Sequence, residues 1–413
     1  MYKAIEKCRL CGNQDLVQVL DLGMQFLTGT FPRQPNGAGI TKGPLSLVKC
    51  LGNEDTCGLL QLGHNYEPSE LYGLNYGYRS GLNEKMVRHL ESKVNAISAF
   101  IDLEPEDLVI DIGSNDGTTL GFFAEHLMRL GIDPTAEKFR DLYKPGIEVI
   151  ADFFSDELIN KKTSGKKAKV ITSFSMLYDL ENPIDFATQI KNILAEDGVW
   201  VFEQSYVHSM IEELAYDTVC HEHLEYYELF QIEWMLEKVG LRVIDVEIND
   251  INGGSFSVVA AHRSSGYIAN SARIEDVRSK ELGKKARGMS LFLDFRKNVE
   301  SHRDQLTELM QKYNDENMRV FGLGASTKGN VLLQYCGFGP ENIIAIGEIN
   351  LDKNGAYTPG SWIPIVSESE VLRQKPDVLL VLPWHFREFF EKSKKFQGSN
   401  LLFPLPKISI TSH

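Results

Sequence analysis

The residues with the clearest chemical potential lie in LVIDIGSNDGTTL, where an apolar run ends at Asp111 and enters a glycine-rich turn. Gly113 and Gly117 let the backbone pass close to a ligand, and a helix beginning after the turn would offer free amides. Asn115 and Asp116 occupy the tip, so the spacing differs from the dinucleotide fingerprint G-x-G-x-x-G. A carboxylate repels pyrophosphate but attracts a sulfonium, an ammonium group and ribose hydroxyls. The turn therefore predicts an S-adenosylmethionine (SAM) site and methyl transfer.

Two further acidic residues end the next apolar segments. Asp133 follows RLGI, about 20 residues after the turn, where a carboxylate can accept hydrogen bonds from ribose hydroxyls. Asp152 follows EVIA, and beside it Phe153 offers a ring that can stack on adenine. We therefore expect both acids and the ring to line the same nucleoside pocket as the turn.

A second cluster, CHEH, places His221, Glu222 and His223 in consecutive positions after the apolar segment WVFEQSYV, which contains Glu203. Such a cluster can bind a metal, act as an acid–base pair or form a hydrogen-bonded polar network. On a strand, His-x-His would put both rings on one face, and no third metal ligand is evident. The cluster follows the fourth strand of the predicted cofactor domain, where the methyl group and its acceptor should meet. This position favours a general base.

Four of the six cysteines lie within the first 57 residues. Cys8 and Cys11 form a C-x-x-C knuckle, and Cys50 and Cys57 supply a second pair with a wider spacing. Four thiolates leave tetrahedral zinc no open position, so the metal would be structural and would stabilise a segment with little core of its own. The alternative is four free thiols in a reducing compartment.

The composition fits two or three globular domains, with 413 residues of which 43% are hydrophobic. The net charge of −14 argues against a nucleic-acid partner, because only Lys161–Lys162 and Lys166–Lys167 form basic patches. No apolar run reaches the roughly 18 residues of a membrane span, and MYKAIEKCRLC lacks the apolar segment of a signal peptide. We expect a cytoplasmic protein with no membrane partner.

The pattern of apolar runs predicts an α/β protein with a zinc-binding domain at 1–72, a methyltransferase domain at 73–270 and a C-terminal domain at 271–413. A helix is expected over NEKMVRHLESKVNAISAF. After it, short apolar runs alternate with amphipathic stretches, as in a Rossmann-like parallel sheet, and an antiparallel hairpin around 250–253 closes the sheet. The charged region 271–316 should be helical and bridge two domains.

The C-terminal domain is expected to be a second doubly wound α/β unit. It opens with RVFGLGASTKGN, in which a strand, a Gly-x-Gly turn and a helix follow one another. Ser326, Lys328 and Asn330 bring a hydroxyl, an ammonium group and an amide to the helix N-terminus, which suits a phosphate. The P-loop pattern is incomplete, so nucleotide hydrolysis is not implied. The alternative is a purely structural turn.

Together these motifs resemble those of bacterial sugar-nucleotide C-methyltransferases, which methylate C-3 of 4-keto deoxysugars attached to a nucleoside diphosphate. The resemblance spans the chain and rests on CRLCG with DLGMQ, YGYRSGLNEKMVRHL, DIGSNDGT, HEHLEYY, NGGS and GLGASTKGN with YTPG. It implies a zinc-binding domain, a class I SAM methyltransferase domain and a C-terminal domain that helps to hold the nucleotide. It also implies that Tyr76, Tyr78 and Arg79 approach the sugar and that the GLGASTKGN loop meets the substrate phosphate.

The resemblance further implies that His223 removes the proton beside the ketone and that Glu222 assists. A carbon next to a carbonyl becomes nucleophilic as its enolate, so a base must reach one face while the sulfonium methyl lies in line on the other. The chain departs from better-known members at two positions, with Cys220 in place of a tyrosine and Tyr178 in place of a histidine. Tyr178 is a further catalytic candidate, as is His221, and packing alone is the alternative for Tyr178.

The leading hypothesis is a SAM-dependent C-methyltransferase that acts on a nucleotide-linked keto sugar. Its nearest rival is O-methylation of a similar sugar, in which His223 would deprotonate a hydroxyl. A nicotinamide oxidoreductase that uses the C-terminal loop, with Glu348 binding ribose, is a third hypothesis. A sugar-nucleotide-binding module without catalysis is the fourth.

Overall fold

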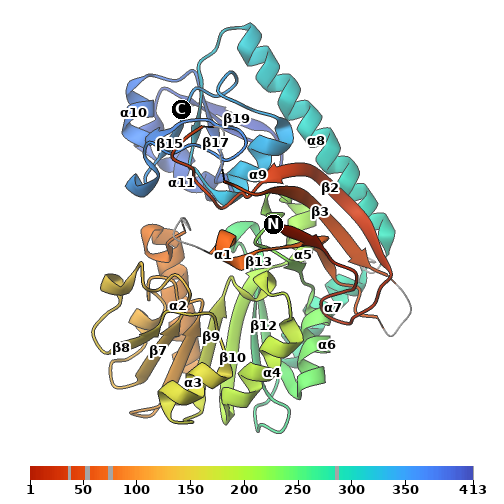
Figure 1. Ribbon diagram of the computed structural model, residues 1–413, viewed down its shortest axis with the longest axis vertical. Coiled ribbons are helices and arrows are strands. Elements are labelled where there is room, and N and C mark those ends of the chain that lie inside the picture. The colour runs from red at the N-terminus through yellow and green to blue at the C-terminus, as the bar shows by residue number, and fades with distance from the viewer. Residues whose placement is uncertain (36–38, 52–55, 73–77, 284–287, 413) are drawn as a thin grey trace.

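The computed structural model describes residues 1–35, 39–51, 56–72, 78–283 and 288–412. Within them the chain forms an antiparallel sheet near the N-terminus, a large mixed sheet in the middle and a second mixed sheet near the C-terminus (Figure 1). Helices accompany the two larger sheets. The α/β class expected from the sequence is therefore confirmed. Among the residues just given, no helix is long and apolar enough to cross a membrane.

The N-terminal part of the chain builds a four-stranded antiparallel sheet. In spatial order its members are β11 (Glu225–Tyr226), β4 (Leu60–Leu62), β3 (Lys42–Cys50) and β2 (Leu16–Phe26). β11 comes from the region predicted as the methyltransferase domain and pairs with β4 at the edge of the sheet. The N-terminal sheet thus borrows a strand from the middle of the chain, and the predicted domain boundaries stay predictions.

A smaller pair of strands lies beside this sheet. β1 (Tyr2–Ala4) pairs antiparallel with β5 (His64–Tyr66). The short helix α1 (Pro68–Leu71) follows β5. This arrangement buries Tyr66, which is 4% exposed and whose ring contacts His221 of the CHEH segment.

Seven strands form the central sheet. They are β6 (Leu108–Ile112), β7 (Met128–Ile132), β8 (Ile147–Ile150), β9 (Ala168–Phe174), β10 (Leu194–Ser205), β12 (Leu241–Asn249) and β13 (Ser255–His262). Their spatial order is β12-β13-β10-β9-β6-β7-β8. β13 runs antiparallel to both neighbours, which confirms the hairpin expected around residues 250–253, and the other neighbouring pairs are parallel. The carboxyl ends of the parallel strands therefore share one edge, where ligands bind in such sheets.

The α-helices that lie between α1 and β12 in the chain accompany the central strands. They are α2 (Glu84–Phe100), α3 (Asp156–Thr163), α4 (Pro183–Ile193), α5 (Val207–Glu212) and α6 (Leu229–Val239). α2 confirms the helix expected from the apolar spacing, since its regularly spaced Met86, Leu90, Val94 and Ile97 are buried. It begins at Asn83, whose side chain accepts hydrogen bonds from two backbone amides of the first turn.

The glycine-rich turn does not begin an α-helix, so that expectation was wrong. Between β6 and β7 the chain makes turns and one short 3-10 segment, η2 (Leu120–Phe122). The local sequence explains this, because Thr118, Thr119 and Gly121 are weak helix formers. The turn therefore offers no helix N-terminus, and its side chains and its tightly curved backbone must do the binding.

Two long helices join the central and C-terminal sheets, which confirms the helical bridge for the described residues. α7 (Ser271–Gly283) comes first, and α8 (Met289–Asp315) then runs along β2 and β3 towards the C-terminal sheet (Figure 1). Phe292 of α8 is 1% exposed, and the Lys49 ammonium of β3 lies 4.7 Å from the centre of its ring. α8 thus packs against both the N-terminal sheet and the C-terminal α/β unit.

The C-terminal sheet has six strands. They are β14 (Val320–Leu323), β15 (Ile346–Glu348), β16 (Ile365–Ser367), β17 (Val378–Val381), β18 (Asn400–Phe403) and β19 (Ser409–Ser412). Their order is β16-β15-β14-β17-β18-β19, with β19 antiparallel to β18 and the rest parallel. The associated helices are α9 (Thr327–Cys336), α10 (Glu368–Arg373) and α11 (Arg387–Lys392). The expected second doubly wound unit is therefore present.

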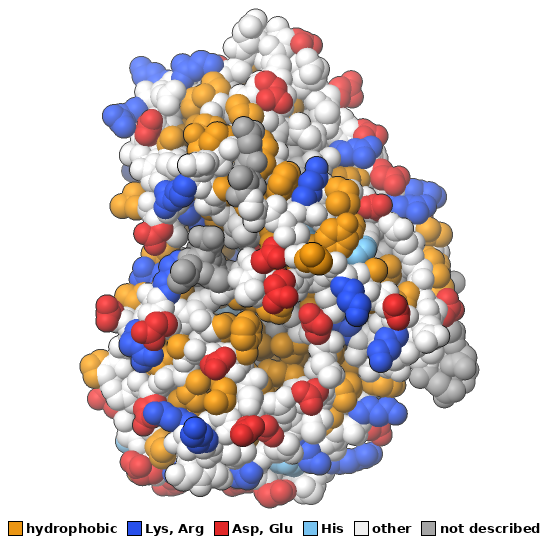
Figure 2. All heavy atoms as spheres, in the orientation of Figure 1, with side chains coloured by type: hydrophobic (Ala, Val, Ile, Leu, Met, Phe, Trp, Pro, Cys, Tyr) orange, Lys and Arg blue, Asp and Glu red, His pale blue; other side chains and the backbone are white. Residues whose placement is uncertain are grey.

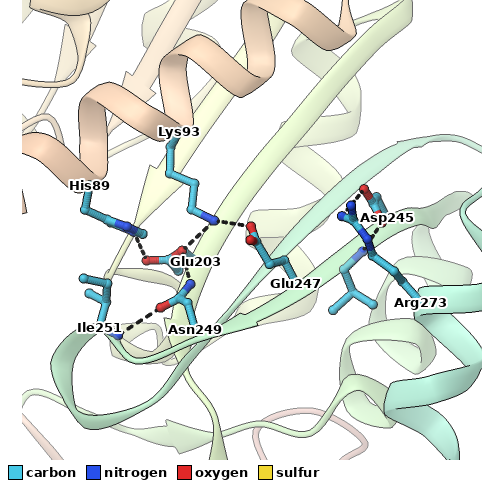
Figure 3. Close-up of polar contacts among 9 residues, drawn as sticks. His89, Lys93, Glu203, Asp245, Glu247, Asn249, Ile251 and Arg273 are labelled. Carbon is cyan, nitrogen blue, oxygen red and sulfur yellow. Dashed lines mark hydrogen bonds and ion pairs between the residues drawn. The ribbon is translucent and has the colours of Figure 1, made fainter.

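Glu203 of β10 anchors α2 and the β12–β13 hairpin to the central sheet (Figure 3). Its buried carboxylate lies 2.6 Å from Nε2 of His89 and 3.3 Å from the Lys93 ammonium, both on α2. The side-chain amide of Asn249 donates to it at 2.8 Å, and the side-chain oxygen Oδ1 of Asn249 accepts from the backbone amide of Ile251. The Glu203 carboxylate therefore has structural partners from both α2 and the hairpin.

Replacement of Glu203 should weaken this anchor. We expect E203A to lower the free energy of unfolding by about 3 kcal/mol, because it leaves the buried Lys93 ammonium and Asn249 amide short of an acceptor. E247A is the matched control, since Glu247 also pairs with Lys93 but its side chain is 59% exposed. That variant should lose only about 0–1 kcal/mol. Urea unfolding measures both, and equal losses would contradict the anchor role.

Candidate active site

A cleft of about 430 Å³ opens at the carboxyl ends of the central strands. Its wall includes Asp111 from β6, Asn115 from the glycine-rich turn, Asp133 after β7 and Phe153 after β8. Figure 2 shows hydrophobic side chains in a hollow on the visible face of the central region, with acidic side chains around it. The volume lies within the range of cofactor sites, and the acidic groups suit a cationic ligand.

Asp111 is the most deeply placed acid of this cleft. It is 3% exposed, and the Thr172 hydroxyl donates a 2.6 Å hydrogen bond to it. Burial raises the pKa of Asp111 to about 7. A bound cation would reverse that shift, because an opposite charge favours the ionised carboxylate.

The turn after Asp111 has the backbone shape that its glycines predicted. Gly113 has φ +73° and Gly117 has φ +75°, both in the left-handed region that favours glycine. At Gly117 a side chain is also excluded sterically, since a Cβ would lie 2.6 Å from the ring of Tyr143. The tip residue Asn115 adopts φ +49° and lines the cleft.

Two acids near the turn bind the protein itself. Asp133 accepts hydrogen bonds from the amide of Asn115 at 2.9 Å and from the hydroxyl of Thr135 at 2.6 Å, while still lining the cleft. Asp116 accepts from the amide of Gly81 at 2.9 Å and pairs with the Arg79 guanidinium at 3.4 Å. Asp116 therefore fastens the segment before α2 to the turn.

The remaining predicted residues of this region are only partly brought together. Phe153 lines the cleft and is 50% exposed, so its ring is available to a ligand. Its neighbour Asp152 is exposed, accepts a hydrogen bond from the Phe153 amide at 2.7 Å and is not among the lining residues. Tyr78 also lines the cleft, whereas Tyr76 lies outside the described residues.

The CHEH segment lies in a turn between the 3-10 segment η5 (Tyr216–Thr218) and β11. Nδ1 of His223 lies 2.8 Å from the carbonyl oxygen of Thr218, and the His223 and Tyr178 rings are 4.3 Å apart. His221 instead packs edge-on against Tyr66 at 4.7 Å. The two histidines thus occupy separate environments, which argues against a shared metal.

Both imidazoles are uncharged at neutral pH. Burial, together with the nearby Lys328 ammonium, lowers the pKa of His223 to about 3. Burial alone drives the pKa of His221 to about 3. A neutral imidazole can accept a proton, so either ring is in the protonation state of a base.

Glu222 sits where three parts of the chain meet. It is 5% exposed, burial raises its pKa, and among the described residues its carboxylate oxygens have no hydrogen-bond partner of normal geometry. A Cβ on Gly29 would lie 1.9 Å from Oε1 of Glu222 and 3.7 Å from the Thr327 hydroxyl. Gly29 is therefore the residue that makes room for the Glu222 carboxylate between the N-terminal sheet and α9.

Buried polar atoms without a partner concentrate around this segment. Within the described part of the chain they include Asp217 Oδ1, Thr218 Oγ1, His221 Nε2, both oxygens of Glu222 and of Glu225, Tyr227 OH, Asn330 Oδ1 and His385 Nδ1. Each such group costs about 1–3 kcal/mol unless water or a ligand satisfies it. The concentration therefore makes this region a candidate binding site.

The three residues predicted to meet a phosphate already have partners within the protein. The Ser326 hydroxyl caps α9 by accepting from the amide of Gly329 at 3.0 Å. The Lys328 ammonium donates to the carbonyl of Asn252 at 2.5 Å, and the buried Asn330 amide donates to the carbonyl of Thr28 at 2.7 Å. Lys328 thus ties α9 to the β12–β13 hairpin, and Asn330 ties it to the N-terminal part of the chain.

Sequence reasoning missed Asp217, Gly29 and His385. Asp217 is 1% exposed, accepts a 2.8 Å hydrogen bond from the indole of Trp384 and lies near the Lys328 charge. Its place four residues before His221 was the available signal. The sequence carries no comparable signal for Gly29 or His385, because their neighbours at the site are far away in the sequence.

The four cysteines predicted to bind zinc come together. Their sulfur atoms all lie within 4.8 Å of one another, with 3.5 Å between Cys8 and Cys57 and 3.6 Å between Cys11 and Cys50. Tetrahedral zinc with Zn–S bonds of about 2.3 Å separates its sulfurs by about 3.8 Å. The cluster therefore fits a structural zinc ion.

Three family models match successive parts of the chain. They are "Putative zinc binding domain" at residues 8–72, "Methyltransferase domain" at 82–246 and "C-methyltransferase C-terminal domain" at 250–406. The C-methyltransferase NovU of Streptomyces niveus is 29% identical over 416 residues, which cover 99% of this chain and 98% of NovU.

Solved methyltransferase structures resemble part of the chain. A SAM-dependent methyltransferase of Clostridium acetobutylicum ATCC 824 is 13% identical with a TM-score of 0.33 and covers 43% of this chain and 92% of its own. The plantazolicin methyltransferase BpumL, in complex with a triazolic desmethylPZN analog and SAH, is 14% identical with a TM-score of 0.35. That match covers 44% of this chain and 87% of BpumL.

The acid-lined cleft, the cysteine cluster and the matched domains define the class: the chain is a SAM-dependent methyltransferase with a zinc-binding N-terminal domain. The C-terminal domain and the full-length relative then narrow the class. The chain is a C-methyltransferase, as the sequence motifs suggested.

The zinc site can be tested by metal analysis. We expect about one zinc per chain, lost when Cys8 and Cys11 are replaced together by serine, because two ligands cannot hold the ion. The double variant should also unfold at lower temperature, since metal binding contributes to folding. C336S is the control, because Cys336 is buried outside the cluster and should leave the zinc content unchanged. Well-folded wild-type protein without zinc would contradict the assignment.

The raised pKa of Asp111 predicts pH-dependent SAM binding. The free protein holds a proton on part of its Asp111 population near pH 7, and a cationic ligand favours the ionised form. Binding should therefore release a proton, and SAM affinity should rise with pH up to about 7 and then level off. Calorimetry in buffers of different ionisation enthalpy measures the release, which D111N should abolish. D152N is the control, and pH-independent wild-type affinity would contradict this account.

Proposed function

We propose that this C-methyltransferase methylates C-3, beside the ketone of a nucleotide-linked 4-keto deoxysugar, through an enolate for which His223 is the base. The observation that carries the proposal is the 2.8 Å hydrogen bond between Nδ1 of His223 and the carbonyl oxygen of Thr218. A carbonyl can only accept, so Nδ1 carries the hydrogen and Nε2 keeps a lone pair. His223 is thereby prepared as a neutral base in a fixed orientation.

The position of His223 supports proton removal near the cofactor cleft. The residue after it, Leu224, lines the cleft together with Met176 and Asp179, which flank Tyr178 in sequence. When bound, SAM supplies an electrophilic methyl group on its sulfonium. Nε2 of His223 takes the proton from C-3, and the C–H electron pair forms the enolate. That carbon then bonds to the methyl group as the methyl–sulfur bond breaks.

Glu222 and Tyr178 are proposed to support the enolate and the base. Burial raises the pKa of Glu222, which favours a protonated carboxyl that can donate to a ketone oxygen as it gains charge. Tyr178 packs its ring against His223 and helps to fix the imidazole. The ring of His221 packs against Tyr66, and its Nδ1 lies 3.4 Å from the Thr28 hydroxyl. We therefore assign His221 to holding the CHEH segment in place.

The cleft residues are proposed to divide the recognition of SAM. Asp111 would balance its positive charge, the remaining acceptor capacity of Asp133 would take a ribose hydroxyl, and Phe153 would stack on adenine. Asn115 would contact the cofactor from the tip of the turn. Gly113, Gly117 and Asp116 would act by shaping the turn, and we assign Asp152 no contact because it lies outside the cleft wall.

The nucleotide is proposed to bind between the central cleft and α9. Lys328 carries charge close to His223, and Ser326 lies at the N-terminus of α9, where a phosphate is favourable. Tyr78 lines the cleft, and Arg79 would extend from its Asp116 pair towards the sugar. The buried amide of Asn330 retains an unsatisfied oxygen that can accept from the substrate or from water.

The geometry disfavours the nicotinamide alternative. Glu348, the candidate ribose acid of the C-terminal loop, accepts hydrogen bonds from three backbone amides, those of Ala325 at 2.8 Å, Ile349 at 2.7 Å and Asn350 at 2.8 Å. A carboxylate used in this way holds the loop closed on itself and has little capacity left for a ribose diol. The other alternative, O-methylation, conflicts with the matched C-methyltransferase domain and with the C-methyltransferase relative.

Removal of His223 tests the enolate directly. With a panel of nucleoside-diphosphate 4-keto deoxysugars, wild-type enzyme should exchange the C-3 hydrogen for solvent deuterium. H223A should lose this exchange and about 10²–10⁴-fold in methyl transfer, because general-base catalysis has that size. SAM affinity should stay within about twofold, since His223 is not among the residues lining the cofactor cleft.

H126A is the matched control, because His126 is exposed and lies outside the cleft wall. It should behave as wild type in exchange, methyl transfer and SAM binding. Nuclear magnetic resonance of the product distinguishes a new carbon-bound methyl group from a methyl ether. Unchanged exchange in H223A, or a methyl ether as the product, would overturn the proposal.

A further inference from the structure

Arg9 lies inside the zinc knuckle, between the ligands Cys8 and Cys11, yet its guanidinium binds the chain next to the proposed base. Nη1 donates to the carbonyl oxygen of Leu62 at 2.7 Å and to that of Leu224 at 3.3 Å. Leu224 directly follows His223. The metal site and the CHEH segment are therefore joined by a single side chain.

The same guanidinium also fastens the neighbouring strand. Nη2 of Arg9 donates to the carbonyl oxygen of His64 at 3.1 Å, and Nε donates to the Asn65 side chain at 3.2 Å. The Arg9 backbone amide donates to the side chain of Gln61 at 3.0 Å. Arg9 thus ties together the knuckle, β4, β5 and the residue after His223.

The backbone at Leu224 has little freedom. Its carbonyl oxygen accepts from the amide of Leu62 at 2.8 Å as well as from Arg9, and its own amide donates to the carbonyl of Tyr178 at 2.7 Å. One residue later, the pairing of β11 with β4 begins at Glu225 and Gln61. The backbone after His223 is consequently held by Leu62 and Arg9 through its carbonyl oxygen and by Tyr178 through its amide.

Residues of the N-terminal region also enclose the other members of the cluster. The ring of Tyr66 packs against His221, and Gly29 leaves the space that the Glu222 carboxylate fills. The CHEH segment has no helix or strand of its own to hold it. Its position therefore depends on the zinc-binding domain.

Arg9 also has an electrostatic role beside these hydrogen bonds. Glu225 is 2% exposed, and burial raises the pKa of its carboxyl group. The positive charge of Arg9 acts in the opposite direction and lowers that pKa. Arginine suits the position because its planar guanidinium can bind several carbonyl oxygens at once, which a lysine ammonium cannot do in the same geometry.

We infer that Arg9 is a positioning residue for His223, through which the zinc knuckle sets the geometry of proton removal. The inference rests on the proposed role of His223 as the base. Misplacement of a reacting group by about 1 Å can cost about 10²-fold in rate. Loss of the Arg9 contacts should therefore slow the chemical step while leaving the cofactor cleft intact.

The test compares R9A and R9K with K7A in the full-length protein. Lys7 is exposed in the same region, so K7A removes the same charge without touching the Arg9 contacts. We expect R9A to lower kcat and solvent deuterium exchange by about 10²-fold, with KM and SAM affinity within about threefold. R9K should recover part of the lost activity, because lysine keeps the positive charge but lacks the several N–H donors of the planar guanidinium. K7A should match wild type.

A structural readout separates positioning from general damage. By mass spectrometry, backbone hydrogen exchange should increase in R9A over peptides spanning residues 218–228 and stay unchanged over the glycine-rich turn at 113–119. R9A should still contain about one zinc per chain. Loss of zinc or of SAM binding in R9A would overturn the inference, because the effect would then be global.

Two outcomes distinguish this inference from the proposed function. If R9A keeps wild-type kcat while H223A is inactive, Arg9 does not position the base and the inference fails alone. If H223A keeps its activity, the proposed function fails and the inference falls with it. If R9A does not fold, R9K decides, and wild-type kcat with unchanged exchange over 218–228 in R9K overturns the inference.

Discussion

The pairing of β11 with β4 is the contact on which the arrangement of the proposed catalytic region depends. Two residues from the middle of the chain complete the edge of a sheet whose other strands come from the first 62 residues. Because β11 begins two residues after His223, the backbone that carries His223 is held in part by the zinc-binding domain. The four-cysteine cluster stabilises a domain too small to have a large core, and so supports that position.

Burial then sets the chemistry of the side chains held there. The same desolvation that lowers the pKa of His223 also raises the pKa of Glu222, so a neutral imidazole and a potential hydrogen-bond donor lie side by side in one turn. Lys328 adds positive charge from α9, and Asp217 lies near that charge. The segment 217–223 and helix α9 thus contribute to one water-poor environment, in which electrostatic effects are larger than in bulk water.

Much of the fold and several site residues could be predicted from local patterns. The left-handed glycines of the turn, the spacing of apolar residues in α2 and the paired cysteines each express a constraint that acts over a few residues. The prediction that went wrong assumed more regular structure than exists. No α-helix follows the turn, because Thr118, Thr119 and Gly121 are weak helix formers.

By itself the sequence determined the strands, the turn, the metal ligands and the chemical types of the candidate catalytic groups, because these depend on residue type and short spacing. Only the tertiary structure decided which groups meet. Arg9 and Leu224 are 215 residues apart, and Asn330 and Thr28 are 302 apart, yet each pair is hydrogen-bonded. Such contacts depend on how the sheets pack, and the pKa of His223 depends on the burial that packing produces.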